Sequence, residues 1–159
     1  MAFEVLHFRD SNQIIKSKNM EKDIEVTLQH IDESLTGTLY KRDLFKQALD
    51  DMDWIQPNGD MVIIENRRYR WKGYKKGIAM ESNLNNYEYI LEGCTRLQIG
   101  YDTGKIDMGI LLLNSKRSDK SPYGDSVSMV KEDIQNLYPT ISLPVTICLF
   151  DFGEPTLPE

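Results

Sequence analysis

The sequence is poor in the residues that build metal clusters and cross-links. Its 159 residues include two cysteines and two histidines, too few and too far apart for a Cys/His zinc cluster of known spacing. No apolar run approaches the roughly 18 residues that a membrane-spanning helix needs, and the first ten residues lack the basic-then-apolar order of a signal peptide. These absences predict a cytoplasmic protein in a reducing setting that does not enter a membrane.

Several catalytic motifs are also absent. The chain has no GxxxxGK[ST] or GxGxxG segment, so the sequence does not support a phosphate-binding loop or a dinucleotide-binding turn. It has no GxSxG segment, and its two histidines lie far upstream of both cysteines. Triad chemistry is therefore not expected.

Positive charge is concentrated in one short segment. The net charge is −6, yet residues 67–76, RRYRWKGYKK, carry six basic side chains and no acid, which leaves −12 for the rest of the chain. We call this segment the basic ribbon; its cations are Arg67, Arg68, Arg70, Lys72, Lys75 and Lys76. Basic groups interleaved with Tyr69, Trp71 and Tyr74 are typical of a surface that neutralises phosphates and stacks on bases. The same alternation also fits a half-buried strand with a solvated cationic face.

Hydrophobic spacing predicts one α/β domain over residues 1–159, with a mainly helical part at 1–55 and a sheet core at 60–152. The pattern predicts a strand at 2–8, helices at 21–35 and about 38–49, and an antiparallel meander of three extended segments, 61–65, 68–71 and 77–81. A helix at 86–101, a strand at 106–113, a helix at 127–138 and a strand at 143–152 follow. The strand–helix–strand order predicts crossovers that join central strands of a mixed sheet.

Two polar side chains stand at the end of one of these strands. Glu81 closes the segment GIAME, and Asn83 follows two residues later, so both side chains lie on the same side of a strand. Magnesium-dependent hydrolysis of a phosphodiester needs hard oxygen ligands and a group that positions the attacking water. Glu81 and Asn83 are therefore candidate catalytic residues, and the alternative is that Glu81 is a strand-end carboxylate satisfied by a lysine of the basic ribbon.

Residues 77–151 resemble the catalytic core of the PD-(D/E)xK restriction endonucleases, most closely the branch of BamHI and BglII. The resemblance rests on GIAMESN, the helix that follows it, the strand GKIDMGILLL and the final strand LPVTICLFDF. It implies a restriction endonuclease-like core, a mixed β-sheet flanked by helices, in an endonuclease of a restriction system. It also implies that the protein acts as a homodimer on duplex DNA with Mg²⁺.

The chain departs from the family motif at two positions. In the resemblance, Glu81 is the first metal carboxylate, and Asn83 stands where the family has Glu, Gln or Lys. The aspartate expected upstream of Glu81 is missing, and the residues that can substitute for it as metal ligands are Glu65 and Asp60. If neither reaches Glu81, the single carboxylate faces Lys72 in an ion pair, and the protein is a catalytically inactive relative, such as a phage or defence-system factor, that binds DNA or a protein partner.

The polar segment 114–126 is predicted to be a loop. It lies where the family places base-reading residues, so the resemblance implies that Lys116 and Arg117 contact DNA. The alternative is a solvated surface loop.

Overall fold

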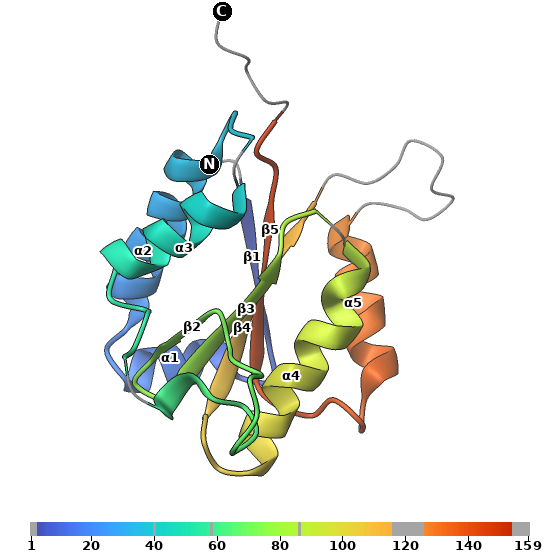
Figure 1. The fold of residues 1–159 in the computed structure, drawn as a ribbon. Coiled ribbons are helices and arrows are strands. Elements are labelled where there is room, and N and C mark those ends of the chain that lie inside the picture. Colours follow the sequence, from blue (N-terminus) through green and yellow to red (C-terminus); the bar gives the residue numbers. More distant parts are fainter. Residues whose placement is uncertain (1–2, 40, 58, 86, 116–125, 154–159) are drawn as a thin grey trace, which may run out of the picture.

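A computed structural model describes the chain except residues 1–2, 40, 58, 86, 116–125 and 154–159. Its centre is a mixed sheet of five strands within the described residues, in the order β1-β5-β4-β3-β2 (Figure 1). The strands are β1 (Phe3–Phe8), β2 (Gly73–Lys75), β3 (Ile78–Asn83), β4 (Met108–Asn114) and β5 (Val145–Phe150). The three inner strands run parallel to one another, and the edge strands β1 and β2 are antiparallel to their neighbours.

Helices cover both faces of the sheet, so the domain has three layers (Figure 1). On one face lie α1 (Ser11–Ser17), α2 (Glu21–Leu35) and α3 (Lys41–Asp51), and on the other lie α4 (Ile90–Asp102) and α5 (Ser126–Leu137). Short 3₁₀ turns occur at Gly59–Met61 and Tyr87–Tyr89. Because both faces are covered, every residue of β5 is buried, as the continuous apolar run VTICLF requires.

The two faces of β3 point into different cores. Ile78 and Met80 pack among α1, α2 and α3, whereas Ala79 packs on the side of α4 and α5. Side chains alternate along a strand, so Glu81 shares the α4 side with Ala79. This register decides which residues surround Glu81.

Most of the predicted elements are present. The helices at 21–35 and 41–51 follow the apolar spacing of residues such as Ile24, Leu28 and Ile31, all of which are buried. The predicted crossovers are confirmed, because α4 joins parallel strands β3 and β4, and α5 joins β4 and β5. The sequence did not predict α1. The helix expected at 86–101 begins at Ile90, after the 3₁₀ turn at Tyr87–Tyr89.

The predicted antiparallel meander is wrong in its first two segments. Residues 61–71 form a narrow hairpin outside the sheet, with one β-bridge between Val62 and Arg70. Within the sheet, β2 and β3 form the antiparallel hairpin. The physical reason is that Met61, Ile63 and Trp71 are buried at the base of the hairpin, while residues 64–70 are exposed and do not pair with any strand of the sheet. Within the described part of the chain, each helix is too short or too polar to span a bilayer.

Candidate nucleic-acid interface

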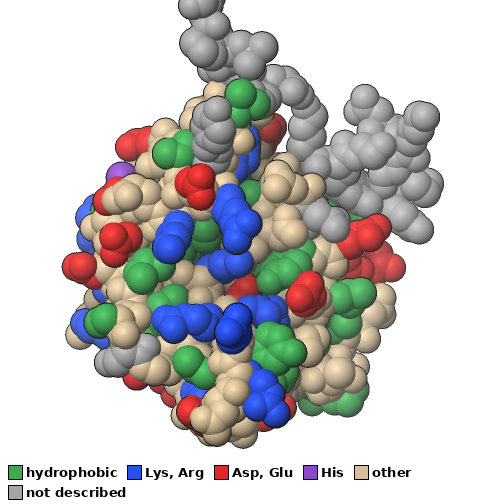
Figure 2. Space-filling model, viewed as in Figure 1, with side chains coloured by type: hydrophobic (Ala, Val, Ile, Leu, Met, Phe, Trp, Pro, Cys, Tyr) green, Lys and Arg blue, Asp and Glu red, His purple; other side chains and the backbone are tan. Residues whose placement is uncertain are grey.

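A cleft of about 620 Å³ lies between α3 and the end of β3. Its floor is apolar, formed by side chains such as Phe45, Leu49 and Trp71, and its rim is cationic. The cationic lining residues are Lys41, Arg42, Lys46, Arg70 and Lys72, against one acid, Asp43. On the face of the molecule in Figure 2, Lys and Arg side chains gather across the middle. The acidic body therefore carries a local positive surface.

Most of these cations have no carboxylate partner. Lys41 donates to the carbonyl of Thr38 and lies 5.7 Å from the ring centre of Phe152. Arg42, Lys46 and Arg70 form no ion pair with any residue that the structure describes. Unpaired cations around a concave surface concentrate positive potential there. The cleft is thus suited to a polyanion.

The hairpin formed by residues 61–71, which we call the arm, borders this cleft. Its strands are joined by the Trp71 N–H to the Met61 carbonyl and the Ile63 N–H to the Tyr69 carbonyl, both at 2.9 Å. A β-turn at Ile64–Arg67 closes the tip, with Asn66 at its third position at φ 64°. Asparagine tolerates this left-handed conformation better than most residues.

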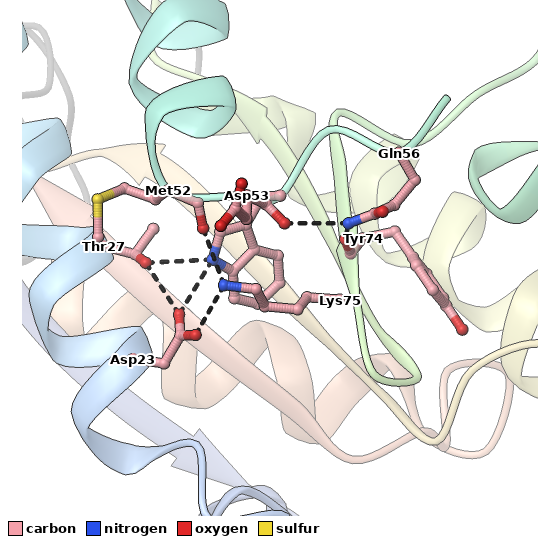
Figure 3. A network of polar contacts seen from close by, with 8 residues as sticks. Asp23, Thr27, Met52, Asp53, Gln56, Tyr74 and Lys75 are labelled. Carbon is pink, nitrogen blue, oxygen red and sulfur yellow. Dashed lines mark hydrogen bonds and ion pairs between the residues drawn. The ribbon is translucent and has the colours of Figure 1, made fainter. Parts of the chain in front are cut away.

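The basic ribbon divides into exposed cations and one structural cation. Arg67 and Arg68 lie near the tip of the arm, Arg70 and Lys72 line the cleft, and Lys76 is exposed in the β2–β3 turn. Lys75 instead points inward, as Figure 3 shows, where its ammonium group binds Asp23 at 2.7 Å and the Met52 carbonyl at 2.8 Å. These contacts favour a structural role for Lys75 over the predicted contact with DNA.

The network around Lys75 ties three elements together. Asp23 and Thr27 of α2 both accept hydrogen bonds from the indole N–H of Trp54, and the Lys75 ammonium lies 5.6 Å from the centre of the Trp54 ring. Gln56 donates to the carbonyls of Asp53 and Tyr74 (Figure 3). The network fixes β2, and with it the end of the basic ribbon, against α2 and the segment that follows α3.

Two of the three ribbon aromatics are not free to stack on bases. Trp71 is 2% exposed and donates its indole N–H to the Arg96 carbonyl, and Tyr74 is half-buried and stacks on Trp71 at 6.5 Å. Tyr69 is 54% exposed. The interleaved pattern therefore combines core anchors with one surface ring.

Glu81 is fully buried, at 0% exposure, and both of its carboxylate oxygens have donors. Arg96 of α4 donates its Nε–H to Oε1 at 3.1 Å, and the Tyr89 hydroxyl donates to Oε2 at 2.9 Å. Burial raises the pKa of Glu81, although the charges of Arg96 and Lys72 and the two hydrogen bonds oppose the rise. Burial and the negative charge of Glu81 likewise raise the pKa of Tyr89.

The other candidate metal ligands are engaged elsewhere. Glu65 is 76% exposed and binds Lys105 at 2.7 Å, and Asp60 is exposed in the 3₁₀ turn at Gly59–Met61. Asn83 lines the cleft, and its side-chain oxygen accepts the backbone N–H of Asn85 at 3.0 Å. No group of three acidic, histidine or cysteine side chains that could hold a metal occurs in the described part of the chain. The metal role of Glu81, Glu65 and Asp60 and the catalytic role of Asn83 stay predictions.

These contacts fit a magnesium ion poorly. Magnesium prefers several oxygen ligands in octahedral geometry and retains waters, which requires access to the carboxylate. Glu81 does not line the cleft, its two oxygens already accept hydrogen bonds, and its nearest charges are cations. We therefore derive no catalytic step through a metal at this position.

Sequence reasoning missed part of the interface. The cations of α3 were not singled out, although Arg42 and Lys46 stand four residues apart and so share one helix face. Arg96 was also missed, because its partner lies fifteen residues away on another element. The predicted DNA contacts Lys116 and Arg117 lie outside the described residues.

No family model matches this chain, and no curated protein matches it. Among solved structures, the restriction endonuclease BglII complexed with a DNA 16-mer aligns over 94% of this chain and 76% of its own, with a TM-score of 0.64 and 14% identity. Free BglII aligns over 95% of this chain and 80% of its own, with a TM-score of 0.59 and 14% identity. The predicted fold class is therefore confirmed: the chain has an α/β restriction endonuclease-like fold.

Proposed function

We propose that this protein binds duplex DNA through the cleft between α3 and the end of β3 and through the neighbouring arm. The observation that supports the proposal is the set of unpaired cations on the cleft rim, Arg42, Lys46 and Arg70, in a chain whose net charge is −6. A structural neighbour is described as a complex with DNA, which adds support through the shared fold. A cluster of cations on a protein of negative net charge raises the local concentration of a polyanion at this cleft.

We further propose that Glu81 is a buried counter-ion for Arg96 and not a metal ligand. Lys72 stands nine residues before Glu81, within the stretch where the family resemblance leads one to expect an aspartate. A cation there adds positive charge beside Glu81 instead of the second carboxylate that a magnesium ion needs. Binding to DNA is then independent of divalent ions, and the protein does not cleave DNA.

The cleft is tested by removing its charge. In a variant carrying Arg42→Gln, Lys46→Gln and Arg70→Gln, we expect the slope of log affinity against log salt to fall by about 2–3, since each phosphate contact contributes about 0.9. A matched control removes three exposed cations that do not line the cleft: Lys16→Gln, Lys22→Gln and Lys131→Gln. Equal losses in the two variants, or no salt-dependent binding by the wild type, would contradict the proposal and favour a protein partner.

The metal question needs a separate assay. Wild-type protein is incubated with mixed plasmid and phage DNA at low salt, with magnesium, with manganese, or with a chelator, beside Glu81→Ala. We expect equal binding in all three conditions and no cleavage. Cleavage by the wild type that Glu81→Ala abolishes would overturn the counter-ion proposal and restore Glu81 as a metal ligand.

The resemblance also predicts a homodimer. We propose that two copies bind one duplex, as the mass of the complex in solution with a short duplex would reveal. A complex with one protein copy per duplex at saturation would contradict this.

A further inference from the structure

The arm carries exposed cations that the cleft does not explain. We propose that the arm enters the major groove of duplex DNA and that Arg67 and Arg68 contact guanine bases there. This inference rests on the proposed DNA binding and deepens it, because it assigns base reading to the arm and leaves phosphate binding to the cleft.

The base of the arm is held from both sides. Met61, Ile63 and Trp71 are buried in the domain. Lys105 donates to the Val62 carbonyl at 3.0 Å, and Arg96 donates to the Arg70 carbonyl at 2.5 Å. Both strands of the arm are therefore tied to α4 or to the turn that follows it, which reduces the ordering cost when the tip meets a ligand.

The tip presents its side chains to solvent. Arg67, Arg68 and Tyr69 are exposed, and neither arginine forms an ion pair with a residue that the structure describes. Among the described residues, the Arg67 guanidinium contacts one group, the carbonyl of the adjacent Asn66, to which it donates a hydrogen bond. The carboxylate nearest in sequence, Glu65, is held by Lys105. The two guanidinium groups thus have N–H donors available for hydrogen bonds to a ligand.

The shape of the arm selects the groove. The major groove is about 12 Å wide and admits a two-stranded ribbon, whereas the minor groove is about 6 Å wide. The arm is two-stranded up to the Ile63–Tyr69 hydrogen bond, and its tip is a tight turn. An arginine fork matches the O6 and N7 acceptors that guanine shows in the major groove. This match points to guanine as the base that is read.

The test compares a short G·C-rich duplex with the same duplex in which 7-deazaguanine replaces every guanine. The replacement removes the N7 acceptor from the major groove and leaves the phosphates and the minor groove unchanged. We expect wild-type affinity to fall by about 2- to 13-fold for each contacted guanine, because the replacement removes one of the two hydrogen bonds of a bidentate contact worth about 1–3 kcal/mol. The salt slope should not change.

The variant Arg67→Ala/Arg68→Ala should bind the two duplexes equally well. A control of equal charge, Lys16→Ala/Lys22→Ala, should retain the wild-type ratio. Circular dichroism checks that both variants fold, which we expect because all four side chains are exposed.

The outcomes separate this inference from the cleft proposal. Salt-dependent binding with equal affinity for both duplexes leaves the cleft proposal intact and overturns the arm inference. Displacement of the protein by a minor-groove ligand such as netropsin, with no effect of 7-deazaguanine, would place the arm in the minor groove and overturn it as well. Absence of binding to any duplex would overturn the cleft proposal first.

Discussion

The pair formed by Glu81 and Arg96 predicts an asymmetric response to mutation. The Glu81 side chain is 0% exposed, whereas the Arg96 side chain is 21% exposed and so retains some water. Removing the arginine leaves a buried carboxylate without its main cation, a change that costs about 3–5 kcal/mol in comparable buried pairs. We therefore expect Arg96→Met to lower the free energy of unfolding by about 3 kcal/mol or more.

Glu81→Gln should be much milder. Glutamine keeps the volume and an acceptor for Tyr89 or Arg96, and it removes the desolvation cost that raises the pKa of Glu81. We expect its free energy of unfolding at neutral pH to lie within about 1 kcal/mol of wild type, because the charge left behind is that of Arg96, which is partly exposed and keeps contact with water. Urea unfolding at pH 7 measures both variants, with the exposed Glu92→Gln as control.

The pH dependence gives a second check on the same pair. A folded-state pKa above the ordinary value of 4.5 means that the folded protein binds this proton more tightly than the unfolded chain does. The stability due to this proton is fully present below pH 4.5 and is lost as pH rises through the folded pKa. Wild type should therefore lose stability relative to Glu81→Gln as pH rises above 4.5. A Glu81→Gln variant as unstable as Arg96→Met, or a difference from wild type that does not change with pH, would refute the reasoning.

Two further predictions concern the parts of the fold that support the interface. Lys75→Met should lower the free energy of unfolding by about 1–2 kcal/mol, because the hydrogen bonds of its ammonium group are lost. Its DNA affinity should change no more than that of the control variant Lys76→Met. A comparable loss of stability in both variants would contradict the structural role of Lys75. Gly100→Ala places a methyl group against the Trp71 ring at the base of the arm and should lower the free energy of unfolding by about 1–3 kcal/mol. As a control, Gly59→Ala should barely change thermal unfolding, because a methyl group there has no atom within 4 Å outside its chain neighbours.

The sequence predicted the strands that are buried on both faces and the helices with one apolar face. The strand at 106–113 and the final strand are continuous apolar runs, and such runs belong to inner strands with both faces covered. The apolar spacing of α2 was equally informative. In contrast, RYRW alternates like a strand but pairs with residues 61–63 outside the sheet, and alternation alone does not reveal whether a segment joins the sheet.

The candidate site was harder to predict because its contacts join distant residues. The sequence draws attention to Glu81 as a strand-end carboxylate, but β3 continues to Asn83. The contacts of Glu81 with Tyr89 and Arg96 arise because α4 lies over β3. The cations of α3 reach the cleft through the packing of the N-terminal helices on the sheet. Neither relation leaves a pattern within one segment of the sequence.

Arg96 connects the buried pair to the surface that we propose binds DNA. One guanidinium group donates to Glu81 through Nε and to the Arg70 carbonyl through Nη2, while the Arg96 carbonyl accepts the indole N–H of Trp71. Glu81 therefore orients the arginine that holds the base of the arm. Replacing Glu81 should then loosen the arm and leave the cations that line the cleft in place, because Glu81 does not line the cleft. The two effects separate in the assays above, because a loosened arm reduces the preference for guanine over 7-deazaguanine and leaves the salt slope of the cleft unchanged.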